Sequence, residues 1–133
     1  MTTSIRPSFS PWHIPPLFVA TTFTLGGLLP LWKPVRAIRE FGLPDRIATC
    51  REAQTCFAVY GSRMSMFGIA IYTFYLRGEV SALDTILAIL PVAGVVDGYL
   101  CWREGVPGVG LFRFVSSLVL GGYGYFGLTW TRN

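Results

Sequence analysis

Charged residues are scarce in this sequence. They make up 14% of its 133 residues, whereas hydrophobic residues make up 52%. A soluble domain usually carries about a quarter charged residues. So few charges cannot cover a small globular protein, whose surface is large relative to its volume. The scarcity argues against a soluble domain and predicts that membrane lipid covers much of the surface.

Two further kinds of pattern are missing. The chain has no basic run with interleaved aromatic residues, so we expect no nucleic-acid partner. Its three cysteines, Cys50, Cys56 and Cys101, form no C-x-x-C pair, and this spacing argues against a metal site. We therefore expect neither a metal nor a cofactor, and cysteines that stay reduced and pack mostly as small apolar side chains.

Four apolar stretches predict four helices, at about residues 16–31, 53–76, 82–102 and 108–130. A helix needs about 20 apolar residues to span a bilayer. The chain has room for four such helices with short connections, and none for a second domain. The predicted fold is therefore a single all-helical domain, residues 1–133, built as a bundle of four transmembrane helices.

The distribution of cations predicts how this bundle is oriented. Four spans place both termini on one side of the membrane, where the cations are Arg6, Arg77 and Arg132. The connection 33–52 holds more of them: Lys33, Arg36, Arg39, Arg46 and Arg51. Cytosolic loops are enriched in Lys and Arg, so we expect this connection to be cytosolic and both termini to be non-cytosolic. Its first part could form a short helix on the membrane surface or remain a solvated basic loop.

Two charged residues interrupt the apolar helices. Arg63 lies about halfway along the second predicted helix, and Asp97 lies near the cytosolic end of the third. A charge at the centre of a spanning helix costs about 2.5–3.5 kcal/mol and almost always faces the bundle interior with a partner. Because the two helices are consecutive and antiparallel, we predict that Arg63 pairs with Asp97. The pair could simply lock two helices together, or it could mark a functional site.

Small residues accompany the two charges. Gly94 and Gly98 form a G-x-x-x-G face on the third helix, and Gly61 and Ser65 form a similar face on the second. Such faces let helices approach closely. We expect them to support the pairing of these two helices, or to join two copies into a homodimer.

Other polar side chains are placed to surround the charges. Cys56, Tyr60 and Arg63 share one helical face through their spacings of four and three. Glu52 extends this face, while Tyr99 and Glu104 lie near the same end of the third helix. Together these groups could line a cavity open to the cytosolic interface, and Arg113 could join it or extend to the membrane interface. We predict catalytic roles for Asp97, Arg63 and Tyr60, and binding roles for Glu52, Cys56, Tyr99, Glu104 and Arg113.

Three short patterns carry a resemblance to a known family: R-x-F-G-L-P (39–44), G-S-R (61–63) and V-x-D-G-Y (95–99). They resemble small four-helix membrane proteins of bacteria and filamentous fungi, described as a domain of unknown function. Fungal members often belong to secondary-metabolite clusters. The resemblance covers most of the chain after residue 30 and places family positions on Gly61, Arg63, Asp97 and Gly98. The chain is also similar to small membrane proteins assigned to epoxide opening in fungal polyketide pathways, which implies the endoplasmic reticulum.

The resemblance and the charges together suggest a membrane enzyme acting on a hydrophobic polyketide or terpenoid. Asp97 would activate water to open an epoxide, or an internal hydroxyl in a cyclase, with Arg63 orienting it and Tyr60 donating a proton. With a carbon acid as substrate, the same site would be an isomerase. A non-catalytic scaffold or lipid-binding protein that uses the basic connection is the alternative from another class. A transporter would require an oligomer.

Overall fold

The computed structural model describes residues 8–131, and every regular element in that range is a helix. The predicted all-helical class is therefore confirmed, while Arg6 and Arg132 lie outside the described residues. The elements are η1 (Pro11–His13), α1 (Ile14–Trp32), α2 (Pro34–Phe41), α3 (Asp45–Ala48), α4 (Arg51–Leu76), α5 (Val80–Arg103), α6 (Pro107–Tyr125) and α7 (Leu128–Thr131).

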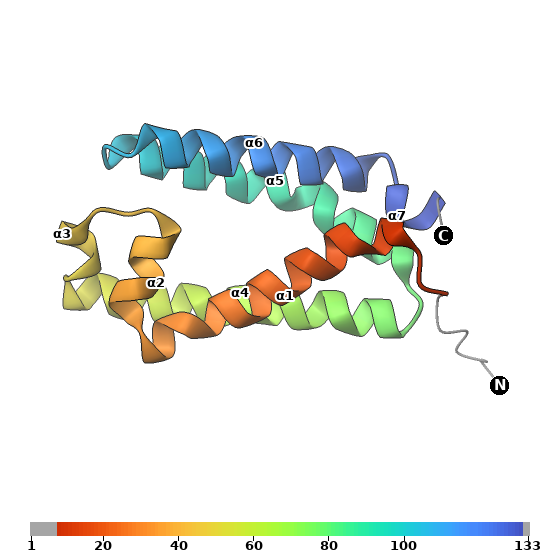
Figure 1. The fold of residues 1–133 in the computed structure, drawn as a ribbon, viewed down its shortest axis with the longest axis horizontal. Coiled ribbons are helices and arrows are strands. Elements are labelled where there is room, and N and C mark those ends of the chain that lie inside the picture. The colour runs from red at the N-terminus through yellow and green to blue at the C-terminus, as the bar shows by residue number, and fades with distance from the viewer. Residues whose placement is uncertain (1–7, 132–133) are drawn as a thin grey trace.

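The long helices form two antiparallel pairs (Figure 1). Helix α1 packs along α4, and α5 packs along α6, whereas contacts between the two pairs are few. The pairs meet at the end that holds α7 and the start of α1. They diverge toward the opposite end, where α2 and α3 lie (Figure 1). We call these the narrow end and the wide end.

Glycine brings α1 and α4 into backbone contact. Gly27 and Gly61 face each other so closely that a Cβ atom on either would clash with the other's carbonyl oxygen. One turn further along α4, the Ser65 hydroxyl donates a hydrogen bond of 3.0 Å to the Thr24 carbonyl. The small-residue face of α4 therefore packs against α1.

The G-x-x-x-G face of α5 packs against α6 in the same way. A Cβ on Gly110 would lie 2.7 Å from the Gly98 carbonyl oxygen, and one on Gly94 would clash with the Ser117 side chain. The prediction that these faces join the second and third long helices is wrong, because each face is occupied by the other member of its own pair.

An apolar cluster joins the two pairs at the narrow end. Its buried members come from α1, α4 and α5: Val19, Ala20, Ile71, Val80, Leu83 and Leu87. Asp84 is buried beside it and accepts hydrogen bonds from the amides of Thr129 (3.1 Å) and Trp130 (2.9 Å). This carboxylate therefore holds α7, and with it the end of the described chain, against α5.

Residues 34–48, which we call the bridge segment, cross the wide end between the pairs (Figure 1). Helix α2 ends at Phe41 and is capped by Gly42, whose φ of 103° is left-handed. The amides of Gly42 and Leu43 close this turn onto the carbonyls of Arg39 and Ile38, the usual arrangement at a glycine-terminated helix. Gly42 packs against Val109 of α6, so the bridge segment spans from one pair to the other.

Two of the described helical stretches are long and apolar enough to cross a membrane, Pro11–Trp32 and Val80–Arg103. In each, only 28% of the most apolar window is buried inside the protein. Because most of each apolar window is left unburied by the protein itself, these two helices support a membrane location.

Candidate functional site

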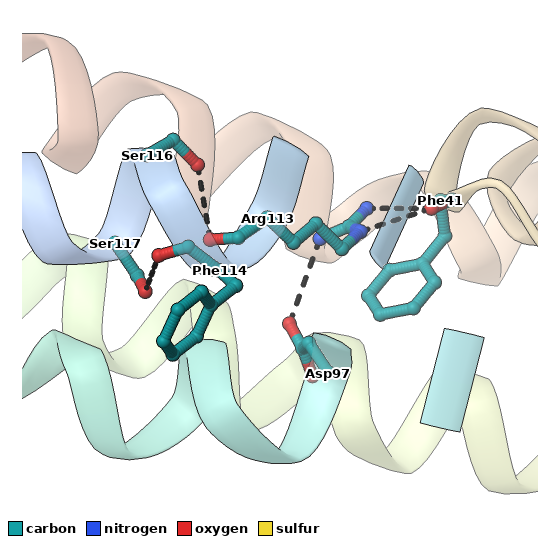
Figure 2. Close-up of polar contacts among 6 residues, drawn as sticks. All are labelled: Phe41, Asp97, Arg113, Phe114, Ser116 and Ser117. Atoms are coloured by element: carbon teal, nitrogen blue, oxygen red, sulfur yellow. Dashed lines mark hydrogen bonds and ion pairs between the residues drawn. The ribbon is translucent and has the colours of Figure 1, made fainter. Parts of the chain in front are cut away.

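Asp97 forms its ion pair with Arg113 of α6 (Figure 2). Arg113 Nη1 lies 3.6 Å from Asp97 Oδ2, and the two side chains are 26% and 20% exposed, respectively. The partnership follows from the packing of α5 on α6, since Asp97 lies beside the glycine face that meets α6. Arg113, predicted only as a binding residue, is thus the cation at the centre of the site.

The predicted pairing of Arg63 with Asp97 is wrong. Arg63 is exposed on α4, and within residues 8–131 it forms no ion pair. Gly61 and Ser65, on either side of it, turn toward α1. Arg63 therefore points away from the line of close contact between α1 and α4, which we call the α1–α4 seam. Helices α4 and α5 are consecutive, but each is committed to a different neighbour, which leaves the two charges apart.

Arg113 is fixed by the end of α2. Its Nε and Nη2 donate hydrogen bonds of 3.0 and 2.8 Å to the Phe41 carbonyl oxygen (Figure 2). Its guanidinium carbon also lies 3.5 Å from the centroid of the Phe41 ring. Phe41 is the last residue of α2, where helix carbonyls lack intrahelical partners and the helix dipole is negative. Arg113 therefore caps α2 and is held in one orientation.

The Phe41 ring connects this cation to α4. It packs edge-on against Phe57 at a centroid distance of 5.3 Å and against Tyr60 at 6.0 Å. Within residues 8–131, the Tyr60 hydroxyl has no protein hydrogen-bond partner. Tyr60 therefore lies close to the charged pair with a hydroxyl that is available to a ligand.

The space between the helix pairs is a cavity. Its largest part, about 480 Å³, is lined by Tyr60, Asp97 and otherwise apolar side chains from α1, α4 and α5. Two smaller hollows of about 140 Å³ each share Phe23, Tyr60 and Met64 with it, and both reach Arg113. We call these three connected hollows the central cavity. Asp97 and Arg113 are the only charged residues among those that line it within residues 8–131.

The serines near the pair are engaged with their own helix. The Ser116 hydroxyl donates to the Arg113 carbonyl (3.1 Å) and the Ser117 hydroxyl to the Phe114 carbonyl (2.8 Å) (Figure 2). No carboxylate or imidazole within residues 8–131 activates either serine. The groups left to do chemistry are therefore the Asp97 carboxylate, the Arg113 guanidinium and the Tyr60 phenol.

Two of the other predicted binding residues lie at the start of α4, away from the cavity. Glu52 and Cys56 are both exposed. The Glu52 carboxylate accepts a hydrogen bond of 3.1 Å from the Cys50 thiol. This bond, together with the backbone amide of Glu52, holds the pKa of its carboxyl below the usual value.

The remaining two predicted binding residues, Tyr99 and Glu104, lie near the end of α5. Tyr99, together with Trp102, lines a shallow groove on the outside of the α5–α6 pair. Glu104 forms an ion pair of 2.5 Å with Arg46, which fastens the bridge segment to α5. Glu104 therefore helps to close the wide end and takes no part in the cavity.

The role of Phe41 and the partner of Asp97 were missed by the sequence reasoning. The partner had a signal: Gly110, Arg113 and Ser117 repeat at spacings of three and four, which places Arg113 on the small-residue face of α6. The contribution of Phe41 is a backbone carbonyl, which side-chain patterns do not register. No group of three or more His, Cys, Asp or Glu side chains suited to a metal occurs within the described range.

Comparison with known proteins gives one match. Residues 20–127 match the family Domain of unknown function (DUF4267), and the chain belongs to this family. The match includes every residue of the central cavity and the bridge segment. No curated protein and no solved structure matches the chain.

Proposed function

We propose that this member of the DUF4267 family is a membrane enzyme that converts a hydrophobic small molecule in the central cavity. One observation carries the proposal: a carboxylate, a guanidinium and a phenol meet on the walls of a largely apolar cavity. Ligand sites are typically apolar hollows with a few placed polar groups. Intramembrane charges usually mark function, so this cavity is the natural place for chemistry.

The membrane part of the proposal is a bundle of four spanning helices, α1, α4, α5 and α6. Exposed tryptophans lie at both ends of these helices, Trp32 and Trp102 at the wide end and Trp12 and Trp130 at the narrow end. Tryptophan is enriched at membrane interfaces. The exposed cations of residues 33–52 favour a cytosolic wide end, with both termini non-cytosolic. In a fungal cell the membrane would be that of the endoplasmic reticulum.

The proposed chemistry is the opening of an epoxide by water. Asp97 takes a proton from the water as its oxygen attacks a ring carbon, and the carbon–oxygen bond of the epoxide breaks. Tyr60 donates a proton to the departing oxygen, and the proton on Asp97 returns to Tyr60 through water. Arg113 takes the orienting role that the sequence assigned to Arg63. An internal hydroxyl in place of water would make the enzyme a cyclase, and a carbon acid as substrate would make it an isomerase.

The test uses the purified protein in lipid nanodiscs with a panel of apolar polyketide and terpenoid epoxides. In water labelled with heavy oxygen, mass spectrometry should show one labelled hydroxyl in the diol. Asp97→Asn should lower kcat by about a hundredfold or more, because base catalysis contributes about 10²–10⁴. The control Arg63→Gln should convert the epoxide at the wild-type rate. Full activity in Asp97→Asn would exclude this site.

A binding protein without chemistry is the second candidate. Arg113 directs two of its nitrogens at the Phe41 carbonyl, and this contact is structural whether or not a reaction occurs. Under this alternative, Asp97→Asn lowers the unfolding temperature and leaves ligand binding intact. No epoxide would be converted by either the wild type or the variant.

A further inference from the structure

We propose that the ligand of the central cavity is a neutral amphiphile with a single apolar chain. Its oxygen-bearing head group lies at Asp97 and Arg113, and its chain extends along α5 toward the narrow end. This inference rests on the proposed function, since it names the substrate class of the same cavity. Three features of the cavity carry it: shape, charge and access.

The cavity is elongated and polar at one end only. Its α5 wall extends from Ile86 to Asp97, a distance of about 16 Å at 1.5 Å per residue. The facing wall on α4 extends from Tyr60 to Phe67. Both polar residues of this main hollow, Tyr60 and Asp97, lie at the wide end of these walls. A ligand that fills the hollow therefore has one polar end and an extended apolar remainder.

The charge of the site selects a neutral head group. The Arg113 guanidinium already faces the Asp97 carboxylate, the Phe41 carbonyl and the Phe41 ring. No second cation lines the cavity within the described residues, so an anionic head would meet the Asp97 carboxylate without compensation. A cationic head would in turn meet Arg113. A hydroxyl, carbonyl or epoxide oxygen can accept a hydrogen bond from Arg113 or Tyr60 at no such cost.

The cavity opens sideways, between the two helix pairs. Residues that line both its wall and its rim are strongly exposed, including Val92 (71%) and Ile89 (54%). In a membrane this apolar rim faces lipid, whereas the bridge segment crosses the wide end. A single-chain amphiphile dissolved in the bilayer can therefore enter without passing through water.

Photo-crosslinking in phosphatidylcholine nanodiscs tests the inference. The probes are dodecanol and dodecanoic acid, each with a diazirine at the chain end far from the head group. Peptide mass spectrometry should locate the dodecanol label on α5 near Ile86 and Leu90, and unlabelled dodecanol should compete for it. Dodecanoic acid, applied as its carboxylate, should label these positions about tenfold less, equivalent to about 1.4 kcal/mol.

Two variants make the test specific. Ala93→Trp fills the cavity and should abolish the α5 label, whereas Val119→Trp, on the outer face of α6, should leave it unchanged. Asp97→Asn removes the negative charge that rejects an anion, so the carboxylate probe should gain about tenfold and match the alcohol. Because both probes are compared on the same Asp97→Asn protein, this result does not depend on whether Ala93→Trp folds.

Equal labelling of the wild type by both probes would overturn the inference, as would an α5 label that survives in Ala93→Trp. The outcome is separable from that of the proposed enzyme. Head-selective labelling without any epoxide conversion would support this ligand class and refute the catalysis. Conversion of an epoxide without labelling along α5 would refute the ligand class and leave the catalysis standing.

Discussion

Inside each helix pair the backbones touch, whereas between the pairs they stand apart around a cavity of about 480 Å³. The seams within the pairs are made from glycine and serine, because even a single added methyl group would clash with backbone at Gly27. The space between the pairs is lined by bulky side chains, by the half-buried Asp97 and Arg113, and by Tyr60. The comparison shows that the close backbone contacts lie within the pairs, whereas the cavity lies between them.

This division also explains what keeps the cavity open. Within each pair, the helices approach backbone to backbone at several points along their length. Within residues 8–131 the pairs are joined at the narrow end, by the apolar cluster and by the contact of Trp12 with Tyr123, and at the wide end by the bridge segment. The cavity between them therefore exists because neither pair can spread its helices to fill it.

The largest effect is expected in the α1–α4 seam, where Gly27→Ala and Gly26→Ala form a matched pair. The new methyl group at position 27 would clash with the Gly61 carbonyl and the Ser65 backbone, whereas nothing lies within 4 Å at position 26. Gly27→Ala should lower the free energy of unfolding by about 2–3 kcal/mol. Gly26→Ala should raise it by about 0.5–1 kcal/mol, since alanine favours the helix. Reversible unfolding in detergent measures both, and equal effects would contradict the seam.

An intermediate effect is expected where the pairs are bridged. Arg113→Met leaves the Phe41 carbonyl and the Asp97 carboxylate without their partner, which should cost about 1–3 kcal/mol. Hydrogen exchange should rise in residues 34–48, while exchange along the α1–α4 seam stays at the wild-type level. Arg113→Lys keeps the charge and loses the forked geometry, so its free energy of unfolding and its hydrogen exchange in residues 34–48 should lie between those of the wild type and Arg113→Met. Unchanged exchange in the bridge segment would show that Arg113 does not hold it.

The smallest effect is expected at Arg63, which belongs to neither interface. Arg63→Gln should not lower the free energy of unfolding, because within residues 8–131 Arg63 forms no ion pair that the change would break, and a neutral side chain on a spanning helix costs less than a charge. The same detergent unfolding assay measures it. A loss comparable to that of Arg113→Met would revive the pairing of Arg63 with Asp97 and contradict the arrangement described above.

The sequence was sufficient to predict an all-helical chain and to single out Asp97 and Tyr60, which the structure places in one cavity. Apolar periodicity shows which residues a helix contains, but it does not show which helix is its neighbour. The order along the chain suggested that α4 pairs with α5. The glycine contacts instead pair α1 with α4 and α5 with α6. The Gly110, Arg113 and Ser117 spacing held the missing information, because it matches the small-residue face of α5 that carries Gly94 and Gly98.

The order of the helices along the chain has a consequence for how the protein is made. Each pair consists of neighbouring long helices, so its seam can close as soon as the second helix has been synthesised, and such local contacts form fastest. The bond between Arg113 and Phe41, in contrast, joins positions 72 residues apart. Until α6 emerges, Asp97 has no cation, and the nascent chain carries an uncompensated charge among apolar helices. A chain that ends before Arg113 is therefore expected to be degraded faster in cells than the full-length protein, and pulse–chase labelling measures this difference.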